Sequence, residues 1–159
     1  MAHAGIALRA DGRPVKRPES VLVVVYTHAG EALLMRRADN PDYWQSVTGS
    51  MEWGDERPIA TAVRELREET GIHVGEQELR DWQRSNVYTI FPEWLWKYAQ
   101  GTTENREHMF SLELPQRCAV TLNPAEHGAY EWLPLALAAR RAFSWTNRDA
   151  LQALADGAG

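Results

Sequence analysis

The pattern of hydrophobic positions predicts several short strands in the first third of the chain. Residues 20–27, SVLVVVYT, form a continuous β-branched run, which is typical of a strand covered on both faces. The turn at 28–30 contains a glycine and leads into residues 31–37, EALLMRR, which we predict to close a hairpin. Further strands are expected at 44–48, 79–89, 93–99, 107–114 and 129–133.

One helix stands out, at residues 58–70. Pro58 suits its first turn, where a missing backbone N–H costs nothing, and Gly71 is placed to end it as a C-terminal cap. Four apolar residues recur at helical spacing and would form a buried stripe, namely Ile59, Ala62, Val63 and Leu66.

A second helix is expected at residues 146–155, capped by Ser144 or Thr146. Together the elements indicate one α/β domain at 15–155, in which helices pack on a mixed sheet. Residues 1–14 carry little hydrophobic pattern, so we predict a flexible N-terminal tail there.

Composition agrees with a single globular domain. The chain has 159 residues, of which 44% are hydrophobic and 25% charged. Its longest apolar run, 21–26, is too short to cross a bilayer, and the N-terminus lacks the apolar core of a signal peptide. The single cysteine, Cys118, cannot form an internal disulfide, and the net charge of −5 argues against a nucleic-acid surface. We therefore expect a cytoplasmic protein with neither nucleic-acid nor membrane partners.

The 58–70 helix carries three acids on one edge. At about 100° per residue, Glu65, Glu68 and Glu69 fall within an arc of roughly 100°. Like charges at this spacing repel one another, and a hard divalent cation would remove the repulsion. This pattern points to Mg²⁺, with Mn²⁺ as the alternative ion. We expect the position of Glu69 to need no burial.

A structural explanation of this helix must be weighed against the metal site. Helices rich in Glu and Arg are usually solvated faces with i,i+4 ion pairs. Here, however, the acids gather near the C-terminal end, where the helix dipole disfavours negative charge, and a glycine-containing loop precedes the helix. Both features favour the metal site.

Residues 64–72, Arg-Glu-Leu-Arg-Glu-Glu-Thr-Gly-Ile, match a known motif. They resemble the second half of the Nudix box, G-x5-E-x7-R-E-U-x-E-E-x-G-U, at every fixed position. This resemblance to the Nudix hydrolases implies a pyrophosphohydrolase with an α/β/α sandwich around a mixed β-sheet. It also implies that Glu65 and Glu69 are metal ligands and that Glu68 is a ligand or a water-activating group.

The first half of the box departs from the motif by one residue. Counting back from Arg64 places its first Glu on Glu56, whereas counting forward from Gly49 places it on Asp55. In the family this acid supports the loop, often by pairing with the Arg of the box. Whether Asp55 or Glu56 pairs with Arg64 stays open, and the resemblance makes Gly49, Glu56, Arg64 and Gly71 structural.

Outside the box, the chain from about 15 to 151 resembles the bacterial Nudix enzymes that hydrolyse dihydroneopterin triphosphate in folate biosynthesis. The resemblance rests on stretches at 16–18, 34–37, 41–50, 98–105, 126–133 and 144–148. The most discriminating of them are WQSVTGS and SWTNR.

This closer resemblance implies roles for individual polar residues. Lys16 and Arg36 would hold phosphate oxygens, while Thr48 and Ser144 would hydrogen-bond the substrate. Glu126 would reach the metal site as a further ligand or as the general base.

Three aromatic residues are candidates for stacking on a flat pterin ring, namely Trp44, Tyr98 and Trp94. Taken singly, each of the polar and aromatic assignments has a plainer explanation: the residue could be a core aromatic, a surface charge or a loop residue. His127 is better explained as a loop histidine than as a ligand. Only their joint occurrence in order favours the functional interpretation.

The sequence thus predicts Mg²⁺-dependent hydrolysis of dihydroneopterin triphosphate to the monophosphate and pyrophosphate, with Glu68 or Glu126 as catalytic base. A broader nucleoside triphosphate pyrophosphatase is the first alternative, because pterin and guanine share a hydrogen-bonding edge. A catalytically silent Nudix-like binding domain is the second, although its box carboxylates would usually be lost. The expected partner is a small-molecule triphosphate, and a monomer is favoured over an oligomer.

Overall fold

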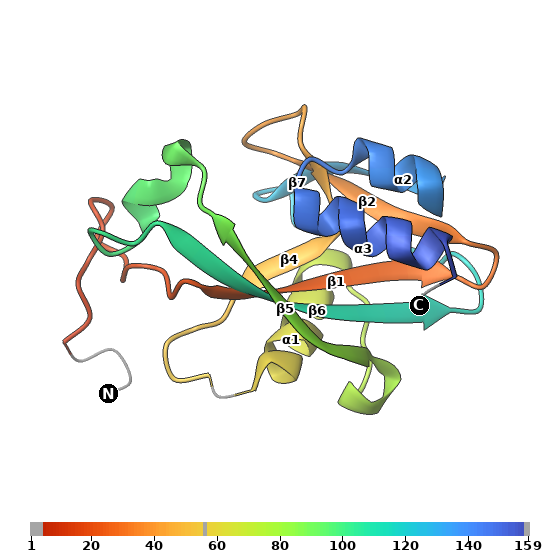
Figure 1. Ribbon diagram of the computed structural model, residues 1–159, viewed down its shortest axis with the longest axis horizontal. Helices are drawn as coiled ribbons and strands as arrows, with labels where there is room; N and C mark the ends of the chain where they lie inside the picture. Colours follow the sequence, from red (N-terminus) through yellow and green to blue (C-terminus); the bar gives the residue numbers. More distant parts are fainter. Residues whose placement is uncertain (1–4, 56, 158–159) are drawn as a thin grey trace.

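A seven-stranded mixed sheet lies at the centre of the molecule (Figure 1). The computed structural model describes residues 5–55 and 57–157. Five strands run in the order β3-β2-β1-β6-β5, while β4 pairs with β1 and β7 with β2. The strands are β1 (Glu19–Thr27), β2 (Glu31–Arg37), β3 (Trp44–Gln45), β4 (Val47–Ser50), β5 (Arg80–Thr89), β6 (Glu104–Leu114) and β7 (His127–Pro134).

Strand β1 is the central element of this sheet. It pairs in parallel with β6 and antiparallel with β2 and β4. The residues from Val21 to Val25 are all buried, as predicted for a β-branched run covered on both faces. The prediction of a hairpin with residues 31–37 is confirmed at the same bounds.

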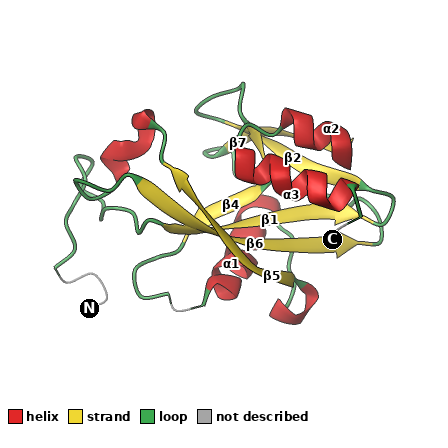
Figure 2. Cartoon of the chain, viewed as in Figure 1, coloured by secondary structure: helices red, strands yellow, loops and turns green. Residues whose placement is uncertain are grey.

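Helices cover both faces of the sheet, which confirms the predicted α/β/α sandwich. Figure 2 shows α1 (Pro58–Thr70) on one side and α2 (Leu135–Arg141) with α3 (Trp145–Ala155) on the other. Alternate residues of β1 divide between the two core layers: Val21, Val23 and Val25 pack on the α1 side. Leu22 and Val24 pack on the side of α2 and α3.

The predicted bounds of α1 are confirmed, and those of α3 are confirmed to within one residue. Helix α1 spans the predicted 58–70, and Gly71 follows it in the left-handed conformation, with φ of 77°. Helix α3 begins one residue earlier than predicted. Ser144 is its N-cap, since its Oγ accepts a hydrogen bond of 3.2 Å from the Asn147 N–H.

The strand predicted at 93–99 is wrong. This segment lies largely in the 3-10 helix η2 (Pro92–Lys97), whose first residue lacks the N–H that a sheet would need. The predicted strand 44–48 is interrupted at Ser46, because the Ser46 N–H donates to Asn147 Oδ1 at 2.8 Å instead of to a neighbouring strand. The sequence also failed to predict α2 and the short 3-10 helix η1 (Glu76–Glu78).

The N-terminal segment makes a turn beside η2. Leu8 and Pro14 form an isolated antiparallel bridge, and the guanidinium of Arg9 lies 4.9 Å from the ring centre of Trp96. Residues 1–4 of the predicted tail lie outside the described residues, and its flexibility stays a prediction.

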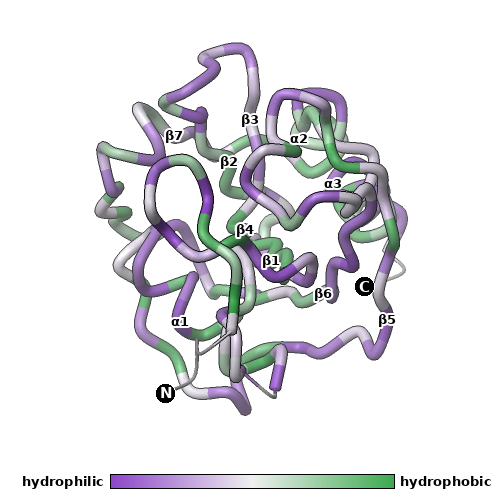
Figure 3. The backbone as a smooth tube through the Cα atoms, turned by 90° about the vertical axis from the view of Figure 1, so that its left-hand side faces the viewer, coloured by the Kyte–Doolittle hydropathy of each residue, from purple (hydrophilic) through white to green (hydrophobic). Residues whose placement is uncertain are grey.

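Hydrophobic and hydrophilic residues alternate over short stretches of the chain (Figure 3). Among the described helices, none is both long and apolar enough to cross a membrane.

Candidate active site

A cavity of about 830 Å³ contains most of the residues that the sequence singled out. Its walls come from the α1 edge, from the ends of β1, β4, β5 and β6, and from the start of α3. Helix η2 and the N-terminal turn complete it. These segments are far apart in the sequence, so the cavity exists only in the folded chain.

The three acids of α1 lie at different depths. Glu68 is half exposed, Glu65 is 9% exposed and Glu69 only 1% exposed. The expectation that Glu69 needs no burial is therefore wrong. Residue 69 follows Leu66 and Ala62 on the inner side of the helix, where the sheet covers it.

Glycine at position 49 gives the Glu65 side chain its space. Gly49 lies on β4 opposite α1, and a Cβ atom added to it would overlap the Glu65 carboxylate. The glycine of the box thus allows strand and carboxylate to approach closely, which any larger residue would prevent.

The electrostatic setting of these acids is unfavourable without a cation. Burial raises the pKa of Glu65 and raises that of Glu69 well above its usual range. The nearby carboxylate of Glu126 raises both further, while Arg64 opposes the shift at Glu65. Neither carboxylate oxygen of Glu69 has a hydrogen-bond partner among the described residues.

Glu126 and His127 approach Glu69 from the start of β7. One ligand atom of each of the three residues lies within 4.8 Å of the other two. The Nε2 atom of His127 lies 4.0 Å from Glu69 Oε1 and 3.2 Å from the Gln45 amide nitrogen. Burial lowers the pKa of His127 to about 4, with Arg37 adding to the effect, so the imidazole is neutral at pH 7.

These residues fit a divalent cation. Carboxylate oxygens and a neutral imidazole are its usual protein ligands, and the buried oxygens of Glu69 lack any other partner in the described chain. Of the four acids predicted as ligands (Glu65, Glu68, Glu69 and Glu126), Glu69 and Glu126 come together in this group, and they do so with His127, which the sequence analysis explained as a loop histidine. A histidine after a loop acid carries no sequence signal of burial.

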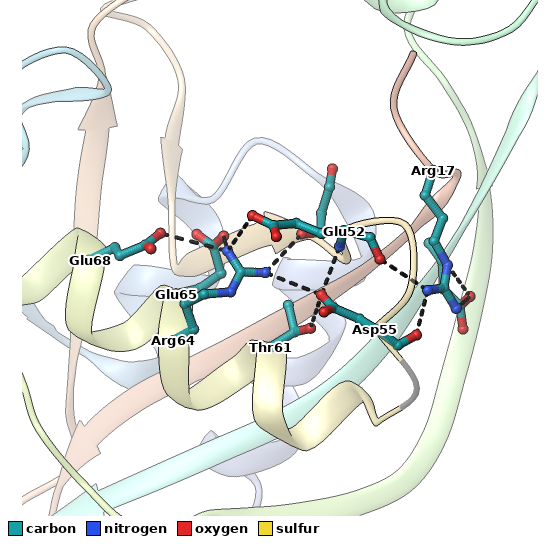
Figure 4. A network of polar contacts seen from close by, with 9 residues as sticks. Arg17, Glu52, Asp55, Thr61, Arg64, Glu65 and Glu68 are labelled. Atoms are coloured by element: carbon teal, nitrogen blue, oxygen red, sulfur yellow. Dashed lines mark hydrogen bonds and ion pairs between the residues drawn. The ribbon is translucent and has the colours of Figure 1, made fainter. Parts of the chain in front are cut away.

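Arg64 organises the loop before α1, as Figure 4 shows. Its guanidinium lies 3.0 Å from a carboxylate oxygen of Glu65 and 3.7 Å from one of Glu68. It also lies 3.5 Å from Asp55 and 3.6 Å from Glu52. One arginine thus holds acids from both the helix and the loop.

Asp55 takes the supporting role that the sequence divided between two residues. Its Oδ2 accepts hydrogen bonds from the Glu52 N–H at 2.8 Å and the Thr61 hydroxyl at 3.2 Å, besides its ion pair with Arg64. Glu56, the other candidate, lies outside the described residues.

Aromatic rings line the cavity. Of the three rings that we predicted to stack on a pterin, two belong to this lining. Trp94 and Tyr98 belong to the lining, and Trp94 stacks on Phe91 with ring centres 5.3 Å apart. Trp44 is outside the lining and packs against the core below α2 and α3, with Arg141 4.7 Å from its ring. The sequence missed Phe91 and Phe143, since nothing distinguishes them from core residues.

Basic side chains also face the cavity. Lys16, predicted as a phosphate ligand, is part of the lining with Arg37 and Lys97. Burial lowers the pKa of Lys16 to about 8, and the charges of Lys97 and Arg37 add to this shift. Arg36 lies outside the lining, next to Trp44 in the β2–β3 pairing, because neighbouring residues of a strand point to opposite faces.

Thr48 and Ser144 both line the cavity, as predicted. The Thr48 hydroxyl donates to the Val21 carbonyl at 3.0 Å, which leaves its lone pairs for a ligand. The Ser144 oxygen accepts from the Asn147 N–H and lies 3.3 Å from the Thr146 hydroxyl, so its proton is free for a ligand when Thr146 is the donor of that pair. Thr48 can therefore accept a hydrogen bond from a ligand, and Ser144 can donate one.

Comparison with known proteins agrees with this geometry. The family model described as the NUDIX domain matches residues 16–154, so the chain belongs to the Nudix family. Dihydroneopterin triphosphate diphosphatase of Escherichia coli strain K12 is 44% identical over 140 residues, covering 86% of this chain and 91% of that protein. The enzyme of the same name from Haemophilus influenzae is 38% identical, covering 86% of this chain and 87% of its own.

A solved structure shows the same fold. The E. coli dihydroneopterin triphosphate pyrophosphohydrolase matches with a TM-score of 0.83 at 40% sequence identity. The match covers 90% of this chain and 98% of that one. The family that the sequence motif predicted is therefore confirmed.

Proposed function

We propose that this protein hydrolyses dihydroneopterin triphosphate to dihydroneopterin monophosphate and pyrophosphate. The observation that carries the proposal is a buried acidic cluster beside a cavity lined by basic and aromatic side chains. The similarity to dihydroneopterin triphosphate diphosphatases extends over 86% of the chain, which supports the same substrate.

The cofactor we propose is Mg²⁺, with Mn²⁺ as a substitute. Glu65, Glu69 and Glu126 would hold it, with Glu68 at the exposed edge and neutral His127 beside Glu69. When bound, the cation neutralises charge on the phosphate oxygens and makes a nearby water more acidic. Its binding would also offset the repulsion among the buried carboxylates.

The phosphate chain requires positive charge that a protein of net charge −5 must supply locally. Lys16, Arg37 and Lys97 face the cavity and would contact phosphate oxygens. We assign the contact expected of Arg36 to Arg37, because Arg37 is the one in the cavity lining. Thr48 and Ser144 would accept and donate one hydrogen bond each.

Hydrolysis needs a base for the attacking water. The water oxygen forms a bond to phosphorus, the anhydride bond to the departing pyrophosphate breaks, and the water proton passes to a carboxylate. Glu68 and Glu126 both line the cavity at the exposed side of the cluster, and we propose that one of them accepts this proton.

Trp94 and Phe91 offer the flat surface for the ring. They stack on each other with an interplanar angle of 16° and lie at the cavity wall beside Phe143. The Arg37 guanidinium lies 4.6 Å from the centre of the Trp94 ring, so a pterin bound at this wall would lie close to the basic side chains that we assign to its phosphate chain. We further propose that the protein is cytoplasmic, because its single cysteine cannot form an internal disulfide. We also propose that it acts as a monomer.

The direct test is the identity of the product. Incubated with dihydroneopterin triphosphate and Mg²⁺, the protein should release pyrophosphate and the monophosphate, and EDTA should stop the release. Orthophosphate as the product, or no Mg²⁺-dependent release from any triphosphate, would contradict the proposal. In the second case the protein would be a silent binding domain.

The substrate is tested by comparison. Values of kcat/KM for dihydroneopterin triphosphate and for the common nucleoside triphosphates should favour the pterin. A strong preference for a nucleotide would replace this substrate with the broader pyrophosphatase activity.

A further inference from the structure

A third buried carboxylate, Glu107, lines the same cavity on the opposite face of the sheet from α1. Glu107 belongs to β6 and is 4% exposed, yet it belongs to the cavity lining. It shares its face of the strand with Met109, which packs in the core layer of α2 and α3. It is therefore separate from the acids of α1, and the reaction described above gives it no role.

The side chains around Glu107 satisfy its carboxylate only in part. Its Oε1 has no hydrogen-bond partner within the described part of the chain. The sheet register places Ser20 of β1 and Asn86 of β5 beside it, and neither side chain makes a hydrogen bond to Glu107 in this structure. Burial raises the pKa of Glu107 to about 7, and the nearby Thr146 hydroxyl only partly opposes this shift. A buried acceptor in this position is costly unless something else donates to it.

We propose that Glu107 recognises the ring of the substrate through an edge that carries a ring N–H next to an amino group. In dihydroneopterin triphosphate this edge is N3–H with the 2-amino group, so the inference rests on the proposed function for the natural ligand. Two carboxylate oxygens accept two parallel hydrogen bonds from such an edge, and no neutral side chain offers two acceptors in this geometry.

This chemistry makes Glu107 a specificity-determining residue and predicts which rings are accepted. Guanine presents the same pair of donors as the pterin. Xanthine has a carbonyl where guanine has its amino group, and this oxygen would face the carboxylate. The protein should therefore favour GTP over XTP among nucleotide substrates, in addition to accepting the pterin.

Glu107→Gln should change this preference in a direction that a structural role would not produce. A glutamine amide presents one acceptor and one donor, which matches the N–H and carbonyl of xanthine but not the two donors of guanine. The ratio of kcat/KM for GTP to that for XTP should fall by roughly 10- to 100-fold, the range expected for exchanging matched and mismatched hydrogen bonds to a charged group. Because both rates come from one sample, incomplete folding of the variant cancels.

Glu104→Gln is the matched control. Glu104 lies three residues earlier on the same strand, is exposed and is absent from the cavity lining, so the GTP to XTP ratio should stay at the wild-type value. If Glu107→Gln leaves the ratio unchanged, or if it lowers both rates equally, the carboxylate is a structural group, for example one paired with Asn86, and the proposal is overturned.

A binding measurement separates this proposal from the proposed function. Neopterin carries the amino edge, whereas the lumazine with the same side chain carries a carbonyl there. By calorimetry, wild type should bind neopterin more tightly, and Glu107→Gln should lose or reverse this preference. Such a result supports the role of Glu107 even if dihydroneopterin triphosphate is not hydrolysed. Equal binding of both rings by wild type overturns it even if the triphosphate is hydrolysed as proposed.

Discussion

The carboxylate of Glu69 is buried, and both of its oxygens lack hydrogen-bond partners among the described residues. Such a group is unfavourable in the folded protein until a cation or a proton compensates its charge. Burial of the Glu69 carboxylate lowers the stability of the folded protein. An apolar side chain beside Leu66 would be more stable here, so a functional role explains the acid better than a structural one. A cation bound at Glu69, as we propose, would therefore also stabilise the folded protein.

Replacing Glu69 with Gln should remove both the binding of Mg²⁺ and the stabilisation that this binding gives. We expect turnover to fall by at least about 100-fold, since even changes to groups behind a metal ligand cost 10- to 100-fold. We also expect the rise in Tm that Mg²⁺ gives the wild type to disappear, because a ligand that binds only the folded state stabilises it. Activity assays and thermal melts with and without Mg²⁺ measure both effects.

Glu78→Gln provides the comparison, because Glu78 is an exposed acid of η1 away from the cavity. It should keep wild-type turnover and the wild-type Mg²⁺ response. Full activity in Glu69→Gln would remove Glu69 from the metal site.

Glu107 makes a separate prediction about stability and pH. Its pKa rises from an ordinary value of 4.5 to about 7 in the folded protein, so the folded state holds the proton more tightly than the unfolded state. The contribution of the protonated group to stability is present below pH 4.5 and is lost as the pH rises through 7. The loss amounts to about 3 kcal/mol, from 1.36 kcal/mol for each pKa unit.

Glu107→Gln cannot lose this contribution, because its amide does not titrate. Relative to the wild type, the variant should gain stability between pH 5 and pH 8 in urea unfolding experiments with EDTA present. The same experiment on Glu104→Gln should show no such gain. A constant difference between Glu107→Gln and the wild type at both pH values would mean that Glu107 is solvated.

At the level of secondary structure, β4 and α1 act as one unit. Residues of β4 pair with β1, and Gly49 leaves space on the helix side for the Glu65 carboxylate. Arg64 then connects the intervening loop to the helix through Asp55. The strand, loop and helix together position the acids, which explains why the motif extends over all three.

Gly49→Ala tests this coupling. The added methyl group would displace the Glu65 carboxylate, so we expect turnover to fall by roughly 10- to 100-fold, as for other changes that disturb a metal ligand. Gly75→Ala is a suitable reference, because the added atom there meets only the end of the flexible Gln77 side chain. Mg²⁺-dependent pyrophosphate release measures both, and equal activity of the two variants would rule out the steric role of Gly49.

The secondary-structure elements differ in how well their local sequence predicts them. Helix α1 was predicted at its observed bounds because its signals are local: Pro58 starts it, Gly71 ends it and an apolar stripe lies between them. Residues 93–99 were mistaken for a strand because aromatic residues alternate there with polar ones. In the structure their rings pack against Phe91 and Lys97 around one helical turn, a contact that alternation cannot reveal.

For the molecule as a whole, charge is distributed unevenly. The net charge is negative, yet basic residues from the N-terminal turn, β2 and η2 meet in the cavity, among them Arg9, Arg13, Lys16, Arg37 and Lys97. The same lining contains acids, among them Glu65, Glu68 and Glu126, so attraction of a polyanionic substrate would depend on the basic residues together with the cation that these acids would hold. The sequence assigned phosphate binding to Arg36, whereas the fold presents Arg37 to the cavity.

The two neighbouring arginines can be distinguished by kinetics. Arg37→Ala should raise KM roughly tenfold, the effect expected from losing one hydrogen bond to a charged group. Arg36→Ala should change KM much less, and Arg140→Ala, on the exposed side of α2, should not change it. A larger rise for Arg36→Ala than for Arg37→Ala would favour the assignment made from sequence.

The sequence by itself determined the acidic helix, its caps, the central hairpin and the family, because each of these depends on residues close together in the chain. It also identified Glu65, Glu69 and Glu126 as the residues that approach one another. The motif could not indicate depth, since burial of Glu69 depends on how closely the sheet packs beneath the helix.

Only the tertiary structure decided which side chains share the cavity. Glu107, Phe91 and Arg37 come from segments that are distant in sequence, and each depends on strand register or on the packing of a loop. A one-residue change in register would turn any strand residue to the other face of the sheet. For this reason the acids of α1 could be identified from the motif, whereas the residues that we propose for recognition of the ring required the fold.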